Sequence, residues 1–199
     1  MSQSRQPPLP PIANKLTQSN SKNSLNILHW NCFSLTEERL IELSLFINDL
    51  SEELNQPDVI SLNEIKLNNE LANHRLKIDG YRSLVKCRKK NPLKGGGVAL
   101  LIRDSIQFNL NDSFNKLFPD LEIISISIKM ENNSKLDFIT YYNPPEQEPK
   151  TKFFQELHSQ KSSFILVGDL NCKSPTFQSR TTNKNGQILE EPKKNSMTL

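Results

Sequence analysis

The chain has 199 residues, enough for one domain with a substantial hydrophobic core, and a formal net charge of +3 at pH 7. So small a charge does not by itself predict a nucleic-acid partner. No apolar run is long enough to span a bilayer, so we expect an intracellular protein without a membrane partner. The cysteines lack Cys-x-x-Cys spacing, which argues against a disulfide framework and a structural zinc site; they are Cys32, Cys87 and Cys172.

Residues 1–24 are rich in Pro, Ser, Gln and Asn and contain few large apolar side chains. Such a segment cannot offset its ordering entropy by burial, so we predict a disordered tail. The tail also lacks the apolar stretch of a secretory signal. Residues 25–199 are therefore expected to form the folded domain.

The first predicted strand, residues 25–31, is apolar and β-prone and ends in Asn31. Apolar residues then recur every three or four positions from Leu40 to Leu54, which predicts an amphipathic helix with Thr36 as its N-cap. After Pro57 a second strand leads to Glu64, for which the neighbouring sequence offers no obvious charge partner.

Residues 81–87 and 98–102 are predicted strands on either side of a basic loop. A solvated surface loop is the simpler interpretation of its charges, and contact with a phosphate backbone is the alternative. The run from Gly95 to Gly97 permits a close backbone approach but lacks the Lys-Ser/Thr of a phosphate-cradling loop. The basic residues are Lys86, Arg88, Lys89, Lys90 and Lys94.

Ile alternates with Ser or Lys over residues 124–129, which predicts a half-buried strand. Another strand, residues 136–142, ends in two tyrosines, of which one should pack inward and the other face outward. A short helix near residues 149–159 should precede a buried strand, residues 164–167, that carries Asp169 and Asn171 into a turn. This order of strands and helices predicts an α/β domain with mixed sheets covered by helices.

The polar residues at the ends of these strands suit phosphodiester hydrolysis. Glutamate and asparagine supply the hard oxygen ligands that Mg²⁺ prefers. An aspartate can orient or deprotonate a water molecule, and a tyrosine hydroxyl can bind a phosphate oxygen. The residues in question are Asn31, Glu64, Tyr142, Asp169 and Asn171.

The order of the motifs resembles the endonuclease/exonuclease/phosphatase superfamily. Within that superfamily it is most similar to the apurinic/apyrimidinic-endonuclease-like domain of non-LTR retrotransposon polyproteins, and the segment 179–189 resembles the one that follows Gly-Asp-x-Asn there. The motifs are Trp30-Asn31-Cys32, Leu62-Asn63-Glu64, Gly95-Gly96-Gly97-Val98-Ala99-Leu100, Tyr142-Asn143-Pro144-Pro145 and Gly168-Asp169-Leu170-Asn171.

The resemblance implies a four-layered α/β sandwich of two mixed sheets flanked by helices. It implies nicking of DNA that depends on Mg²⁺, or on Mn²⁺, by a monomer in the nucleus, with a reverse transcriptase domain in the parent polyprotein. Glu64 would be the metal ligand, and Asn31 would lie at the metal and the phosphate. Tyr142 would contact the phosphate, Asp169 would orient the attacking water, and Asn171 would bind the scissile phosphate.

The sequence departs from the superfamily in lacking the late Ser-Asp-His motif, since its histidines are His29, His74 and His158. We therefore expect a domain truncated at its C-terminus, without the last strands of the second sheet and with weak or no activity alone. Cys32-Phe33-Ser34 also replaces the usual small or basic residues after the first asparagine. The alternatives are a non-catalytic, degenerate copy that binds nucleic acid, and a phosphoesterase of the same superfamily that acts on inositol phosphates or lipids.

Overall fold

The computed structural model describes residues 24–53, 56–130, 134–160 and 162–190. The predicted disordered tail lies outside these ranges, apart from Ser24. In the described ranges the strands form two four-stranded sheets, and no helix is long and apolar enough to cross a membrane.

The first sheet has the strand order β1-β2-β4-β3, with β1 parallel to β2 and the other neighbours antiparallel. The second sheet has the order β5-β6-β7-β8, with only β7 and β8 parallel. The strands of the first sheet are β1 (Ile27–Asn31), β2 (Val59–Asn63), β3 (Tyr81–Lys86) and β4 (Val98–Arg103). Those of the second are β5 (Phe108–Leu110), β6 (Glu122–Lys129), β7 (Lys135–Tyr142) and β8 (Ser163–Asp169).

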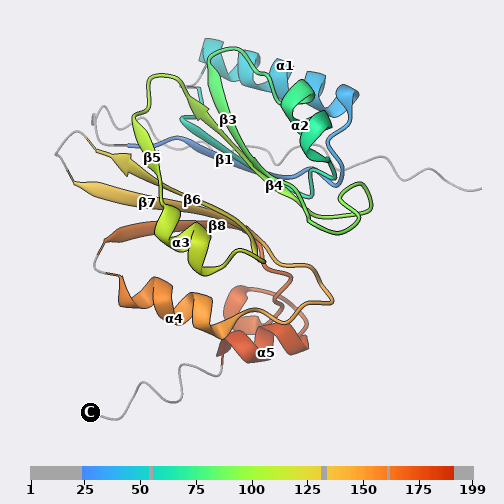
Figure 1. The fold of residues 1–199 in the computed structure, drawn as a ribbon, viewed down its shortest axis with the longest axis vertical. Helices are drawn as coiled ribbons and strands as arrows, with labels where there is room; N and C mark the ends of the chain where they lie inside the picture. Colours follow the sequence, from blue (N-terminus) through green and yellow to red (C-terminus); the bar gives the residue numbers. More distant parts are fainter. Residues whose placement is uncertain (1–23, 54–55, 131–133, 161, 191–199) are drawn as a thin grey trace, which may run out of the picture.

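Helices cover the outer faces of both sheets, so the molecule has four layers (Figure 1). On the first sheet lie α1 (Glu37–Glu53) and α2 (Asn69–Arg75). On the side of the second sheet lie α3 (Asp112–Leu117), α4 (Thr151–Ser159) and α5 (Lys184–Glu190), with a short 3₁₀ helix at Pro175–Phe177. The predicted sandwich of two mixed sheets between helices is therefore confirmed.

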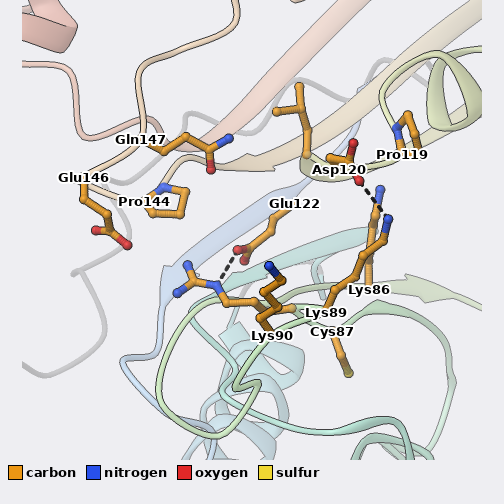
Figure 2. Close-up of a pocket in the computed structure, with 12 residues that line it drawn as sticks. Lys86, Cys87, Lys89, Lys90, Pro119, Asp120, Glu122, Pro144, Glu146 and Gln147 are labelled. Atoms are coloured by element: carbon orange, nitrogen blue, oxygen red, sulfur yellow. Dashed lines mark hydrogen bonds and ion pairs between the residues drawn. The ribbon is translucent and has the colours of Figure 1, made fainter.

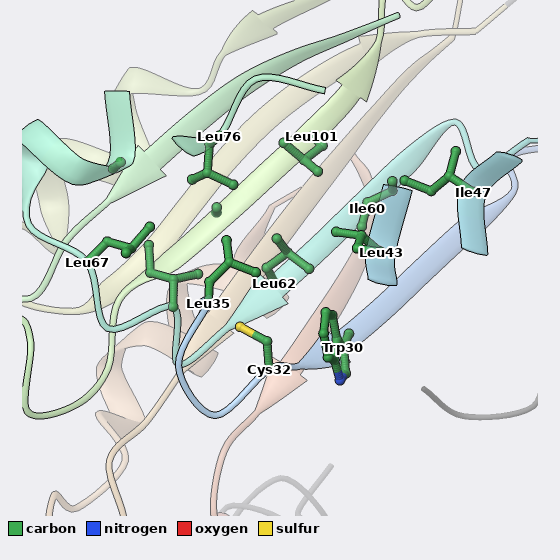
Figure 3. Packing of buried hydrophobic residues seen from close by; sticks show 13 residues of the cluster. Trp30, Cys32, Leu35, Leu43, Ile47, Ile60, Leu62, Leu67, Leu76 and Leu101 are labelled. Carbon is green, nitrogen blue, oxygen red and sulfur yellow. The ribbon is translucent and has the colours of Figure 1, made fainter. Parts of the chain in front are cut away.

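The helix α1 follows the predicted pattern. The Arg39 backbone N–H donates to the Thr36 hydroxyl at 3.4 Å, so Thr36 caps the helix. Leu43 and Ile47 are buried against the first sheet (Figure 3). Leu54, the last residue of the predicted stripe, lies outside the described residues.

A second cluster of apolar residues fills the space between the sheets, and a third lies between the second sheet and its helices. The predicted strands are present as β6 and β7, and the two tyrosines at the end of β7 point to opposite faces of the sheet. Two of the predicted exposures are wrong, however, because α3 and α4 cover the outer face of the second sheet. Ser125 is buried, and its backbone N–H and carbonyl both bond the Asn115 side chain of α3, at 3.1 and 3.2 Å. Tyr141 and Tyr142 are both buried, Tyr141 against Phe153 of α4 and Tyr142 between the sheets.

The loop after β1 has an unusual backbone. The N–H groups of Ser34 and Leu35 donate to the carbonyls of Glu64 and Ile65, at 2.7 and 2.9 Å, so the loop stays attached to the chain after β2. Phe33 and Ser34 have φ values of 45° and 97°, where side chains with a Cβ are strained. One guanidinium nitrogen of Arg39 donates to the carbonyls of Cys32, Phe33 and Ser34 and holds the loop in place.

We expect Ser34→Gly to raise the free energy of unfolding by about 0.5–1 kcal/mol, because glycine adopts a positive φ without strain. Ser44→Gly, in the middle of α1, is the matched control and should lower it by about 1 kcal/mol. Urea denaturation followed by circular dichroism measures both changes. A lower stability of Ser34→Gly would contradict the strain assigned to this loop.

Gly168 allows β7 and β8 to approach each other just before Asp169. Its φ is 152°, and a Cβ at this position would lie 1.8 Å from the Tyr141 carbonyl oxygen, which belongs to backbone and cannot move aside. The register that results pairs Tyr142 with Asp169. Gly168 is thus the residue that permits the parallel pairing on which the position of Asp169 depends.

Gly168→Ala should therefore destabilise the fold by at least about 3 kcal/mol. Gly80→Ala is the control, because Gly80 also has a positive φ of 80° but no atom lies within 4 Å of the added Cβ. Its cost should be backbone strain alone, about 1 kcal/mol. Equal melting temperatures for the two variants would show that the contact of the added Cβ with the Tyr141 carbonyl does not destabilise the fold.

Candidate functional site

Three strand ends from the two sheets meet at one rim of the molecule. Asn31 ends β1, Glu64 directly follows β2, and Asp169 ends β8. The Asn31 amide nitrogen donates to Glu64 Oε1 at 2.9 Å and to Asp169 Oδ2 at 3.0 Å. One neutral donor therefore joins two carboxylates that belong to different sheets.

Glu64 has a charge partner that the sequence pattern did not reveal. The Lys66 ammonium lies 3.8 Å from Glu64 Oε2, and only 15% of either side chain is exposed. Both residues have a positive φ, 56° for Glu64 and 50° for Lys66. Strained backbone of this kind is concentrated at functional sites, where it fixes the direction of side chains.

The Asp169 carboxylate is held at both oxygens. While Oδ2 accepts from Asn31, Oδ1 accepts from the Asn171 backbone N–H at 2.9 Å. The Asn171 side-chain nitrogen donates to the Asn143 carbonyl at 2.9 Å, so the amide of Asn171 has a fixed orientation. Hydrogen bonds thus fix both the Asp169 carboxylate and the Asn171 amide within this turn.

Tyr142 lies beside this pair of carboxylates, in the core between the sheets. Burial raises the pKa of its hydroxyl, and the negative charges of Glu64 and Asp169 raise this pKa further. The hydroxyl consequently stays protonated at neutral pH and can donate a hydrogen bond. The structure brings Asn31, Glu64, Tyr142 and Asp169 together, with Asn171 supporting Asp169; their chemical roles stay predictions.

Two asparagines that the sequence analysis did not single out as site residues support the turn. Asn143 is fully buried, and its amide nitrogen donates to the Gln147 carbonyl at 2.7 Å. Asn183 donates to the Asn171 carbonyl at 2.8 Å and accepts from the Lys173 backbone N–H at 2.9 Å. Asn183 lies in the segment 179–189, and its link to Asn171 gives that segment a structural connection to the site.

The thiols near the site are not activated. The structure shows the three cysteines as free thiols. Burial raises the pKa of Cys32 to about 12, and burial together with the charge of Asp169 raises that of Cys172 to about 11. Both thiols stay protonated at neutral pH, in keeping with a role in packing.

A hollow of about 330 Å³ opens between the basic loop and the segments after α3 and β7 (Figure 2). Arg88, whose guanidinium lies 5.9 Å from the centre of the Tyr142 ring, bonds Glu122 at 2.6 Å. Lys89 similarly bonds Asp120 at 2.8 Å. Two of the basic side chains are therefore neutralised by acidic neighbours, while Lys86 and Lys90 also line the hollow.

The oxygen atoms gathered here fit a hard divalent cation. Mg²⁺ is usually bound by one or two protein carboxylates, with water and substrate phosphate completing its shell. The described part of the chain has no cluster of three or more His, Cys, Asp or Glu residues suited to a metal. The Glu64 and Asp169 pair is a smaller set, of the size that Mg²⁺ needs when a phosphate is also bound.

Comparison with solved structures shows the same fold in other proteins. The AP endonuclease LMAP from Leishmania major is 18% identical, with a TM-score of 0.59 over 82% of this chain and 60% of that chain. The catalytic domain of APE2 from Xenopus laevis is 17% identical, with a TM-score of 0.50 over 75% of this chain and 59% of that chain. The chain thus spans about 60% of the length of these two structures.

A third structure, an endonuclease/exonuclease/phosphatase family protein from Bacteroides thetaiotaomicron, is 11% identical, with a TM-score of 0.52 over 84% of this chain and 67% of that one. No curated protein matches the sequence. Residues 28–194, most of the chain, match the model of the Endonuclease/Exonuclease/phosphatase family. On this evidence the chain belongs to the endonuclease/exonuclease/phosphatase family.

Proposed function

We propose that this protein is a Mg²⁺-dependent DNA endonuclease that nicks one strand and leaves a 3′ hydroxyl group. The observation that carries the proposal is the pair of carboxylates, Glu64 and Asp169, held by one Asn31 amide beside the protonated hydroxyl of Tyr142. These groups can hold a cation, orient a water molecule and donate to a phosphate oxygen.

The proposal includes a role in retrotransposition, in which the 3′ hydroxyl primes a reverse transcriptase of the same polyprotein. The order of the sequence motifs and the resemblance of the segment 179–189, whose Asn183 contacts the Asn171 turn, support it. We propose that the protein acts in the nucleus as a monomer. The basic loop beside Tyr142 offers Lys86 and Lys90 to the phosphate backbone of DNA, as the sequence alternative suggested.

Glu64 is the proposed metal ligand, and the Asn31 side chain fixes its orientation. A bound Mg²⁺, or Mn²⁺ in its place, would neutralise negative charge on the oxygens of the scissile phosphate. Lys66 already pairs with Glu64 at 3.8 Å, so its ammonium can also attract the phosphate toward this carboxylate. Lys66 and a bound cation would together supply the positive charge that attracts the negatively charged phosphate.

Asp169 is the proposed general base. Its carboxylate is oriented at both oxygens, by Asn31 and by the Asn171 N–H, so it can position a water molecule and take up its proton. The water oxygen forms a bond to phosphorus as the bond from phosphorus to the 3′ oxygen breaks, and that oxygen takes a proton from solvent. Tyr142 donates its hydroxyl proton in a hydrogen bond to a phosphate oxygen, and the free N–H of the Asn171 amide does the same.

We expect Glu64→Gln and Asp169→Asn each to lower the nicking of supercoiled plasmid in Mg²⁺ by about 10²- to 10⁴-fold, because each removes a charged oxygen from the reaction centre. EDTA should abolish nicking by the parent protein. The assay needs excess protein and long incubation, since the sequence holds no Ser-Asp-His motif.

Glu42→Gln and Asp49→Asn, exposed acidic residues on α1, are the matched controls and should nick as the parent does. Circular dichroism shows whether each protein is folded. A folded parent without metal-dependent nicking would overturn the proposal in favour of a non-catalytic copy. Release of phosphate from inositol phosphates, with no nicking of DNA, would instead favour the phosphoesterase alternative.

A further inference from the structure

Phe33 is a large apolar side chain exposed to solvent at the edge of the carboxylate site. The residue is 65% exposed, the highest value among the large hydrophobic residues of the described chain. Its backbone N–H donates at 3.2 Å to the oxygen of the same Asn31 amide that bonds Glu64 and Asp169. An exposed ring so close to charged groups gains little from burial, so packing into the hydrophobic core does not explain its presence.

The backbone that presents this ring is rigid. Phe33 itself has a positive φ of 45°, and Arg39 donates to its carbonyl at 2.9 Å and to that of Ser34 at 3.1 Å. The Asn31 side-chain oxygen accepts from the Phe33 N–H and so fixes the N-terminal side of this residue. The backbone of this loop is therefore strained in the conformation that leaves the Phe33 ring exposed to solvent.

Lys66 connects the ring with the metal-binding carboxylate. Its ammonium lies 3.6 Å from the centre of the Phe33 ring and 3.8 Å from Glu64 Oε2. A cation over one face of an aromatic ring leaves the rest of the ring open to a second partner. A nucleotide at the Glu64 site has a phosphate for the ammonium and a flat base for the ring, so both groups could engage the same substrate.

We propose that Phe33 stacks on a nucleobase next to the scissile phosphate, and that the preferred substrate is DNA whose bases are unpaired or unstacked at the nick. This inference rests on the proposed endonuclease function. Aromatic side chains bind bases of any identity through their faces, and a base inside a duplex must first leave the stack to be reached. Phe33 would therefore select the shape of the substrate and not its sequence.

The test compares Phe33→Leu, which keeps an apolar side chain but removes the ring, with Phe33→Trp, which keeps a stacking surface. All three residues carry a Cβ, so the positive φ costs the same in each protein. Phe164→Leu is the matched control, because Phe164 is 37% exposed at the opposite end of β8 from Asp169. Circular dichroism melting establishes that each variant is folded.

The substrates are a fully paired oligonucleotide and the same duplex with a short mismatched bubble that contains 2-aminopurine. In EDTA, which prevents cleavage, the parent should bind the bubble more tightly and quench the fluorescence of 2-aminopurine by stacking. Phe33→Leu should bind the bubble about tenfold more weakly and lose the quenching, while its affinity for paired DNA stays the same. Phe33→Trp and Phe164→Leu should behave as the parent does.

Equal quenching and equal affinity for the bubble in the parent and in Phe33→Leu would overturn the inference, as would the absence of any preference for the bubble in the parent. The proposed endonuclease function would survive either result if the parent nicked DNA in Mg²⁺ and Glu64→Gln lowered that nicking by about 10²- to 10⁴-fold. Conversely, ring-dependent binding of the bubble without metal-dependent nicking would support stacking by Phe33 and reject catalysis.

Discussion

A single amide nitrogen joins the two sheets at the place where their carboxylates meet. Asn31 donates to Glu64 beside the first sheet and to Asp169 on the second. Two negative charges repel each other in a partly buried site, so their approach costs free energy unless donors or cations offset it. Asn31 and Lys66 offset part of this cost. The remaining negative charge favours a divalent cation, and this preference follows directly from the convergence of the ends of β1, β2 and β8.

A chain of buried and half-buried polar groups keeps the sheets in register behind these carboxylates. His29 Nδ1 and the Ser61 hydroxyl lie 3.1 Å apart, and Ser61 bonds the Thr140 hydroxyl of the opposite sheet at 2.7 Å. Thr140 in turn donates to Asn63 at 3.3 Å. Burial lowers the pKa of His29, although the charge of Asp169 raises it, so the imidazole remains neutral and serves as a structural partner. Buried polar groups that satisfy one another tolerate only one alignment of the sheets, and that alignment sets the site.

The fold could be predicted where a pattern extends over several residues. The leucine period of α1 and the apolar runs of β2, β4 and β8 each gave an element close to the observed one. Shorter elements gave no such signal, since α2 and α3 have 7 and 6 residues and β5 has 3. The failure to foresee α3 also explains the error at Ser125, because exposure of a strand face depends on what covers it from elsewhere in the chain.

In the site, too, features set by the local sequence could be predicted, and features set by contacts with distant segments could not. Polar residues at strand ends could be predicted because a strand must end at the rim of a sheet. The positions of Lys66 and Phe33 at the site could not be predicted, because they depend on backbone angles that residues with a Cβ seldom adopt. Of the seven non-glycine residues with positive φ in the described ranges, five lie around the carboxylates, and all of these except Asn171 are of types that favour other conformations. These residues are Phe33, Ser34, Glu64, Lys66 and Asn171. Since such strain persists only when the surrounding fold imposes it, its concentration at one rim is an independent reason, beyond the motifs, to place the function there.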